Sequence, residues 1–192
     1  IMFSSVVPNV FKNVKTSIKK KLRVEVKELK QLNFKKILKI EVNSKQVGSD
    51  RLANAICVLN NKDNFIILDF GTATTFDVVL KNKYKGGIIA PGVNLSLKTL
   101  VEKAKLIPNT KLTKIKDIIG KNTQNAVRSG FYWGYQGLIE NMINLIEKKY
   151  KKKFKIIFTG GLSHLFKDTI KKKIKVDREL TIKGLLRLVD LT

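Results

Sequence analysis

The sequence predicts an α/β protein, in which strand-like and helix-like segments follow one another along the chain. The clearest sign is a series of three strand-like runs at residues 65–69, 74–80 and 84–90, separated by short polar links. Links of this length favour an antiparallel meander. Amphipathic helical patterns lie on both sides of these runs, and two glycine turns follow buried strand patterns. We therefore expect a protein that combines a sheet with helices.

Residues 1–60 form the first expected region. The patterns predict a strand at residues 1–7, a helix at 10–22, strand-like segments at 24–26 and 37–42, and a helix at 51–59. A polar run at residues 60–64 is the candidate boundary, which predicts domains at 1–60 and 61–192. The chain begins with Ile inside an apolar run, so we expect it to be part of a longer protein.

Residues 61–192 contain the three strands and several later elements. These are a helix at residues 95–104, a long helix at 123–149, a strand at 155–159, a helix ending at 166, a strand-like segment from 176 and a helix at 180–188. No repeat of fixed period is present in the sequence.

The long helix carries two stripes. One is apolar and predicts a core face: Val127, Phe131, Leu138, Met142, Leu145 and Ile146. The other consists of small residues: Ala126, Gly130, Gly134 and Gly137. Each helical glycine costs about 1 kcal/mol relative to alanine. Their spacing therefore indicates close approach, either by a neighbouring helix of the same chain or by a second copy of the chain.

Composition narrows the classes of function. Cys57 and His164 are the only cysteine and the only histidine, which excludes an internal disulfide and metal sites built from several such ligands. The net charge of +24 would suit nucleic acid or an anionic membrane, but only five of the 39 basic residues are arginine, the usual reader of phosphates and guanine edges. We interpret most lysines as solvated surface, and expect a cytoplasmic protein with no membrane segment and a preference for anionic substrates.

A candidate phosphate-binding turn lies at residues 68–77 (Leu-Asp-Phe-Gly-Thr-Ala-Thr-Thr-Phe-Asp). Asp69 ends a buried strand, and Gly71 allows the backbone to approach a ligand closely. Threonine hydroxyls and free N–H groups then supply donors for phosphate oxygens, while the carboxylate holds a cation that neutralises them. The alternative is an ordinary β-hairpin rich in threonine for its strand propensity.

A second glycine turn, at residues 158–163 (Phe-Thr-Gly-Gly-Leu-Ser), also follows a buried strand and opens a helix. Phosphates or an adenine ring could lie against its backbone. Alone this signal is weak. Paired with the first turn, it resembles the nucleotide clamp of the actin-like kinase fold.

Six short motifs are distributed along nearly the whole chain. They are residues 4–8 (Ser-Ser-Val-Val-Pro), 48–51 (Gly-Ser-Asp-Arg), 69–75 (Asp-Phe-Gly-Thr-Ala-Thr-Thr), 86–92 (Gly-Gly-Ile-Ile-Ala-Pro-Gly), 120–123 (Gly-Lys-Asn-Thr) and 159–161 (Thr-Gly-Gly). The combination resembles type III pantothenate kinases, bacterial members of the superfamily of acetate and sugar kinases, heat-shock chaperones and actin. The resemblance implies duplicated actin-like (ribonuclease H-like) domains, the first of them incomplete at its N-terminus.

The resemblance also implies a reaction and its residues. The reaction is ATP-dependent phosphorylation of pantothenate, the first step of coenzyme A biosynthesis, with Mg²⁺ and with K⁺ or NH₄⁺ as monovalent cation. Asp50 would be the general base and Asp69 would hold the monovalent cation. The pantothenate site would comprise Gly48, Ser49, Asp50, Arg51 and Thr123, and the ATP site Gly71, Thr72, Gly160 and Gly161.

The residues themselves leave plainer roles open. Asp50 could be a helix N-cap, and Thr123 could cap the long helix. Arg51 could pair with the substrate carboxylate, or it could be an ordinary surface charge. Cys57 is expected to be a small buried residue, and His164 a helix-surface or packing residue. The resemblance further implies a homodimer with the active site near the dimer contact.

One family motif is missing, the N-terminal phosphate loop of Asp-x-Gly-Asn-Thr type. Either the chain is a fragment of an ordinary kinase, or it is a shortened, non-catalytic relative; the intact Asp50, Asp69, Thr72 and Thr123 favour the fragment. The rival function is an accessory factor for transcription that associates with nucleic acid. Its best patch is the lysine run at residues 148–155, but the lysines are scattered without interleaved aromatic residues, so nucleic acid is not expected as a partner.

Overall fold

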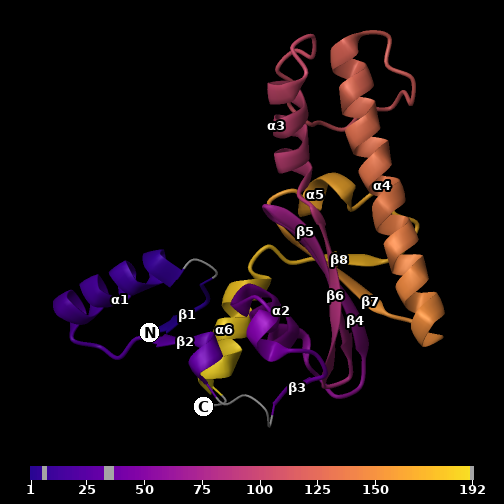
Figure 1. Ribbon diagram of the computed structural model, residues 1–192. Helices are drawn as coiled ribbons and strands as arrows, with labels where there is room; N and C mark the ends of the chain where they lie inside the picture. Colours follow the sequence, from indigo (N-terminus) through magenta and orange to yellow (C-terminus); the bar gives the residue numbers. More distant parts are fainter. Residues whose placement is uncertain (6–7, 33–36, 191–192) are drawn as a thin grey trace. The chain divides into compact units, whose positions relative to one another are not determined.

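The computed structural model describes residues 1–5, 8–32 and 37–190 (Figure 1). Its strands are β1 (Met2–Phe3), β2 (Lys27–Glu28), β3 (Lys39–Ile40), β4 (Asn64–Phe70), β5 (Ala73–Leu80), β6 (Lys83–Pro91), β7 (Lys155–Gly160) and β8 (Ile174–Val176). Its α-helices are α1 (Pro8–Leu22), α2 (Ser49–Val58), α3 (Val93–Lys103), α4 (Thr123–Tyr150), α5 (Ser163–Phe166) and α6 (Leu180–Asp190). Short 3₁₀ turns lie at Leu29–Gln31 and Ser44–Gln46.

The strands form a six-stranded sheet in the order β3-β6-β5-β4-β7-β8 and a two-stranded sheet in which β1 and β2 are parallel. Two-residue links join β4 to β5 and β5 to β6, so these neighbouring strands run antiparallel, and the predicted meander is confirmed. The outer pairs are parallel: Ile40 faces Tyr84 across β3 and β6, and Ile156 faces Ile174 across β7 and β8. The α/β fold class is therefore confirmed.

The chain divides into two compact units. The first comprises residues 1–65, 77–86 and 179–192, and the second residues 66–76 and 87–178. The predicted division into domains at residues 1–60 and 61–192 stays a prediction.

The first unit is organised by the packing of α6 on α2. Gly184 makes this possible, since a Cβ at this position would lie 2.0 Å from the carbonyl oxygen of Ala53. The α6 residue Arg187 donates from Nη1 to the carbonyls of Ile56 and Cys57, at 3.1 and 2.9 Å. These carbonyls belong to the last turn of α2, where basic side chains interact favourably with the helix C-terminus, so Arg187 caps that end. The result is a fixed position for α2.

The core of the second unit is aromatic. Phe70 on β4 meets Phe158 on β7 edge to face, with ring centroids 5.1 Å apart, and stacks on Phe166 of α5 at 5.5 Å. Tyr132 of α4 also stacks on Phe166, with centroids 5.9 Å apart. Large buried rings of this kind contribute more hydrophobic area than any other residue type. They fix the ends of β4 and β7 close to each other, where both glycine turns begin.

The predicted core face of α4 is wrong, with one exception. The residues that α4 buries are Ser129, Tyr132, Ile139, Ile143 and Ile146. Of the predicted stripe only Ile146 is buried; Leu145 is 49% exposed and the other four are partly exposed. The helix carries apolar side chains on two faces, and the periodicity alone does not tell which of them meets the sheet.

Other expected elements differ from the structure mainly at their ends. The strand expected at residues 24–26 lies two to three residues later, at Lys27–Glu28, and the one expected from 176 ends there. The first strand is only Met2–Phe3, and residues 6–7 of its predicted range lie outside the described residues. No helix in the described ranges is both long and apolar enough to cross a membrane.

Candidate functional site

The first group of predicted site residues lies at the N-terminus of α2. Gly48 is the N-cap, and α2 begins at Ser49, so Asp50 lies inside the first turn and is not the cap. The partial positive charge of a helix N-terminus favours a carboxylate at this position. One oxygen of Asp50 accepts the backbone N–H of Arg51 at 2.8 Å, and the side chain stays partly exposed. Asp50 therefore has a defined position from which it can meet a ligand.

Ser49 is fully buried, and its hydroxyl donates to the carbonyl of Ser5 at 2.8 Å. This bond ties α2 to the chain that follows β1. The predicted substrate role of Ser49 therefore cannot depend on a free hydroxyl donor, although its backbone N–H lies at the helix N-terminus.

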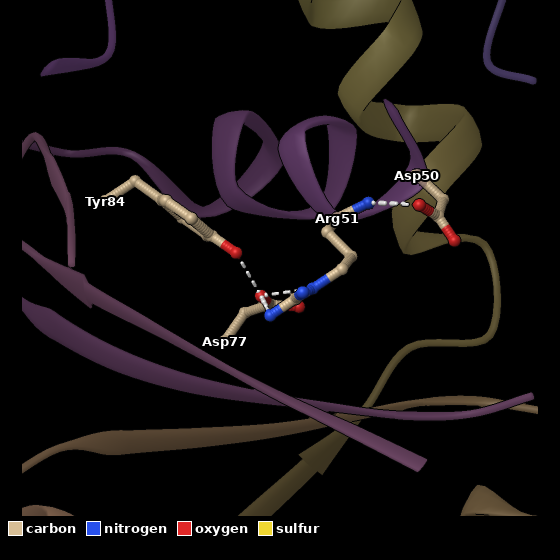
Figure 2. A network of polar contacts seen from close by, with 4 residues as sticks. All are labelled: Asp50, Arg51, Asp77 and Tyr84. Atoms are coloured by element: carbon tan, nitrogen blue, oxygen red, sulfur yellow. Dashed lines mark hydrogen bonds and ion pairs between the residues drawn. The ribbon is translucent and has the colours of Figure 1, made fainter. Parts of the chain in front are cut away.

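Arg51 is not a surface charge. Its side chain is only 13% exposed, and its guanidinium forms an ion pair with Asp77 of β5, as Figure 2 shows. Nε and Nη2 donate to the same oxygen, Oδ1, at 2.8 and 2.7 Å. The hydroxyl of Tyr84 on β6 donates to that oxygen as well, at 2.5 Å. Three donors therefore converge on one buried carboxylate oxygen.

Burial and neighbouring charges shift the pKa values of all three residues in this network. Burial raises the pKa of the Asp77 carboxyl above its ordinary value, while the Arg51 guanidinium opposes that shift. Burial would lower the pKa of Arg51, but the charge of Asp77 and its hydrogen bonds outweigh it, and the pKa is raised. Burial and then the charge of Asp77 raise the pKa of Tyr84, so the phenol stays protonated and remains a donor.

The second group lies where β4 and β7 end. Gly160, at the end of β7, has a φ of +83°, and a Cβ there would lie 2.6 Å from Oδ1 of Asp69 and 2.7 Å from the backbone nitrogen of Phe70. The two predicted glycine turns are therefore brought together. Gly71 also lies against Asp69, with 3.9 Å from a Cβ position to Oδ1. Gly161, in contrast, has open space around it and is exposed.

Gly92, the N-cap of α3, completes this second group. Its N–H donates to the carbonyl of Thr72 at 3.1 Å, and a Cβ there would lie 2.2 Å from that oxygen. The contact holds the turn between β4 and β5 against the start of α3. Gly71 and Thr72 are exposed at the tip of this turn.

These residues fit a phosphate group with its cation. The cradle consists of backbone, glycines and a carboxylate, and no Cβ could be added at Gly92 or Gly160 without a clash. The hydroxyl of Thr74, two residues beyond Thr72, is buried and has no hydrogen-bond partner among the described residues. A carboxylate with backbone oxygens also suits a hard cation such as K⁺. In the described ranges no three His, Cys, Asp or Glu side chains gather as a metal cluster.

Thr123 begins α4, but it is not the cap. Asn122 is the N-cap, and its side chain accepts the N–H of Asn125 at 2.9 Å. Thr123 is exposed at one end of an apolar groove of about 630 Å³ between α3 and α4. The groove is lined by Ser96, Leu100, Thr123, Ala126, Val127, Gly130, Phe131, Gly134, Tyr135 and Leu138.

The three glycines in the small stripe of α4 have open space beside them in the part of the chain that the structure describes. A Cβ at Gly130, Gly134 or Gly137 would meet no atom of the described chain within 4 Å. The prediction of a close neighbour within the chain is therefore wrong for these three glycines, and the alternative, a second copy, stays open.

The lysine run at residues 148–155 does contain interleaved aromatic residues, contrary to the expectation from the sequence. The rings of Tyr150 and Phe154 meet edge to face with centroids 6.1 Å apart, and Nζ of Lys149 lies 5.8 Å from the centre of the Tyr150 ring. Basic residues at a helix C-terminus also interact favourably with the helix dipole, which accounts for part of the run.

His164 is exposed and Cys57 is half-buried.

Asp77, Tyr84 and Gly92 received no role from the sequence. A signal was present for Asp77, because a carboxylate between Phe76 and Val78 in a buried strand requires a partner. Gly92 belongs to the matched stretch at residues 86–92, but the stretch alone assigns it no contact. Its approach to Thr72 depends on the fold.

Comparison with known proteins gives consistent sequence matches. The family model described as type III pantothenate kinase matches residues 1–145. A type III pantothenate kinase of Pelagibacter ubique (strain HTCC1062) is 60% identical over 190 residues, which are 99% of this chain and 77% of that protein. One from Sulfurihydrogenibium sp. (strain YO3AOP1) is 40% identical over 194 residues, covering 96% of this chain and 74% of the relative.

Solved structures show the same fold at low identity. A putative Baf family transcriptional activator from Campylobacter jejuni has a TM-score of 0.70 at 19% identity, covering 100% of this chain and 82% of that one. A putative 2-dehydro-3-deoxygalactonokinase from Sinorhizobium meliloti has a TM-score of 0.52 at 10% identity, covering 74% of this chain and 58% of that one. These likenesses show an actin-like, sugar-kinase type of fold and nothing further.

Proposed function

Because the chain belongs to the type III pantothenate kinase family, we infer that it phosphorylates pantothenate with ATP, the first step of coenzyme A biosynthesis. The observation that carries this inference is the 60% identity to a type III pantothenate kinase over 99% of the chain. A non-catalytic accessory factor for transcription is not favoured, because the sequence relatives are named as kinases.

Asp50 acts as the general base in this proposal. Its carboxylate stands in the first turn of α2, partly exposed, and it is fixed through the N–H of Arg51. From there it accepts the proton of the primary hydroxyl of pantothenate as that oxygen attacks phosphorus. Phosphoryl transfer depends mainly on positioning and charge neutralisation, so one oriented aspartate suffices as base.

Arg51 binds the carboxylate of pantothenate. Its contacts with Asp77 use Nε and Nη2, which leaves the Nη1 side of the guanidinium outside that ion pair. An arginine fork can thus serve a buried carboxylate with one edge and a substrate carboxylate with the other. Gly48, Ser49 and Thr123 complete the substrate site through backbone groups and a hydroxyl.

The ATP-binding part of the proposed site comprises Asp69, Gly71, Thr72, Gly160 and Gly161. ATP with Mg²⁺ supplies the phosphoryl group when bound. The N–H of Gly71 donates to the carbonyl of Ala73, so the exposed turn offers chiefly the hydroxyl of Thr72 to phosphate oxygens. The closeness of Gly160 to Asp69 favours a small, carboxylate-lined site for K⁺ or NH₄⁺.

The chain works as a homodimer in this proposal, with a second copy covering the groove between α3 and α4. The open glycines Gly130 and Gly134, the partly exposed Phe131 and the 36% exposed Leu100 support it, since exposed apolar surface with small residues allows close helix contact. Gly134→Arg should produce monomers in size-exclusion chromatography with light scattering, whereas Gly161→Arg should not. Unchanged dimers in Gly134→Arg would refute this surface.

We place the reaction in the cytoplasm, where coenzyme A precursors and ATP are available to a protein with a single cysteine and no disulfide.

The function is tested by measuring ATP-dependent conversion of pantothenate to 4′-phosphopantothenate. The wild-type protein should turn over, and Glu41→Gln, at a partly exposed ion pair with Lys85, should match it. Lack of any pantothenate-dependent ADP formation would overturn the assignment.

A further inference from the structure

The ion pair between Arg51 and Asp77 is unusual because it is buried. Asp77 is fully buried and only 13% of the Arg51 side chain is exposed. Removing two charges from water costs about as much as their attraction returns, and apolar replacements are often as stable. Stability alone therefore gives little reason for a charged pair here. A better reason is that the guanidinium must be held in one orientation.

The geometry of the pair fixes that orientation. Two adjacent nitrogens of Arg51 donate to one oxygen of Asp77, which determines both the direction and the plane of the guanidinium (Figure 2). Tyr84 donates to the same oxygen from β6 and holds the carboxylate in place. The chain of contacts therefore runs from β6 through β5 to the first turn of α2.

The first turn of α2 is the part of the chain that carries the reaction in the proposed function. Arg51 directly follows Asp50, and its N–H binds the Asp50 carboxylate at 2.8 Å. The backbone N–H that holds Asp50 belongs to the helix, whereas the guanidinium is held by Asp77. A shift of the guanidinium therefore acts on the group assigned to the substrate carboxylate and leaves the group assigned to the hydroxyl in place, so it lowers the affinity for a substrate that carries a carboxylate.

We propose that Asp77 and Tyr84 are positioning residues of the kinase: the buried carboxylate, held by the phenol, directs the Nη1 edge of Arg51 toward the carboxylate of pantothenate. The proposal rests on the function inferred above, and in particular on the role of Arg51. It explains why a charge is retained inside the strand sequence Phe76-Asp77-Val78.

The test uses two substrates that differ only where Arg51 acts. One is pantothenate, and the other is its alcohol analogue, in which the carboxylate is replaced by a hydroxymethyl group while the reacting hydroxyl is unchanged. The variants are Asp77→Asn and Tyr84→Phe, with Arg51→Lys as reference and Glu41→Gln as control, all in protein expressed from its complete reading frame. Glu41 is an acid of the same unit in a more exposed ion pair.

We expect Asp77→Asn to raise the KM for pantothenate about tenfold or more, the effect of losing one well-placed charge-assisted hydrogen bond, with a change of less than about threefold for the alcohol. Tyr84→Phe should act in the same direction by about two- to fivefold, because the ion pair itself remains. Glu41→Gln should change neither KM. In the combined Asp77→Asn, Arg51→Lys protein the effects should not add, since both act through one guanidinium.

Equal losses for both substrates in Asp77→Asn, or unchanged KM values in a folded variant, would overturn the proposal and leave a structural ion pair only. If Arg51→Lys itself does not discriminate between the substrates, the role assigned to Arg51 fails instead. If Asp77→Asn does not fold, Tyr84→Phe provides the test, through its change in KM for pantothenate relative to its change in KM for the alcohol. The Arg51 Nε–H in ¹H–¹⁵N spectra should exchange slowly with solvent in the wild type and faster in Asp77→Asn, where its acceptor loses its charge; equal protection in both would contradict the proposal independently of catalysis.

Discussion

Gly184→Ala should destabilise the protein, although alanine is the better helix former. The substitution adds one methyl group to α6 where it packs on α2. That methyl carbon would lie 2.0 Å from the carbonyl oxygen and 2.6 Å from the carbonyl carbon of Ala53. Both atoms belong to the backbone, so no side-chain rotation can relieve the contact, and the two helices must move apart.

The magnitude follows from two opposing terms. Replacing a helical glycine by alanine stabilises by about 1 kcal/mol. Forcing an extra carbon into a packed contact costs about 1–3 kcal/mol, and a backbone neighbour places this case at the upper end. The net loss is about 2 kcal/mol, which lowers the Tm by about 4–8 °C for a chain of this size.

The assay is urea denaturation, followed by circular dichroism and by the fluorescence of Trp133, with Gly137→Ala as the matched control. Gly137 lies inside α4 with nothing within 4 Å of a Cβ position. Gly137→Ala should therefore gain up to about 1 kcal/mol. If Gly184→Ala is as stable as Gly137→Ala, the described packing of α6 on α2 is wrong.

Three further predictions concern the site. Gly92→Ala should abolish detectable binding of ATP analogues in calorimetry while the protein stays folded, because a Cβ 2.2 Å from the carbonyl of Thr72 displaces the turn; wild-type affinity would contradict this. Burial raises the pKa of the Asp77 carboxyl above its unfolded value, so its contribution to the free energy of unfolding is full below the unfolded pKa and declines as the pH rises through the folded pKa. Asp77→Asn should lack this decline when both proteins are unfolded at a series of pH values from the unfolded pKa of aspartate upward, and parallel curves would count against it. Replacing K⁺ by choline should lower kcat in the wild type but have little further effect in Asp69→Asn; an equal K⁺ response in both would remove Asp69 from the cation site.

Local patterns predicted most of the elements because they depend on neighbouring residues. The meander at residues 64–91 and the bounds of α4 follow from strand alternation, helix period and turn residues in the sequence itself. The side of α4 that meets the core does not follow in this way. Both of its faces carry apolar residues, and the choice between Val127 and Tyr132 depends on what packs against the helix.

The candidate site was predictable in its residues, but only through the resemblance to a family. Asp50 and Arg51 look like helix-start and surface residues in isolation. Their arrangement depends on Asp77, which is 26 positions away from Arg51 in the chain, and on Tyr84 on the next strand. The same holds for Gly160 and Asp69, which only the core formed by the aromatic residues of β4 and β7 brings together. Contacts of this range leave no periodic signal in the sequence.

The most direct test is the rate of pantothenate phosphorylation by ATP in the presence of K⁺, measured for the wild type and for Asp50→Asn. The account predicts turnover by the wild type and a loss of about 10²–10⁴-fold in kcat for Asp50→Asn, the usual contribution of a general base, with the affinity for ATP unchanged. Wild-type rates in Asp50→Asn, or ATP hydrolysis that does not depend on pantothenate in the wild type, would contradict it.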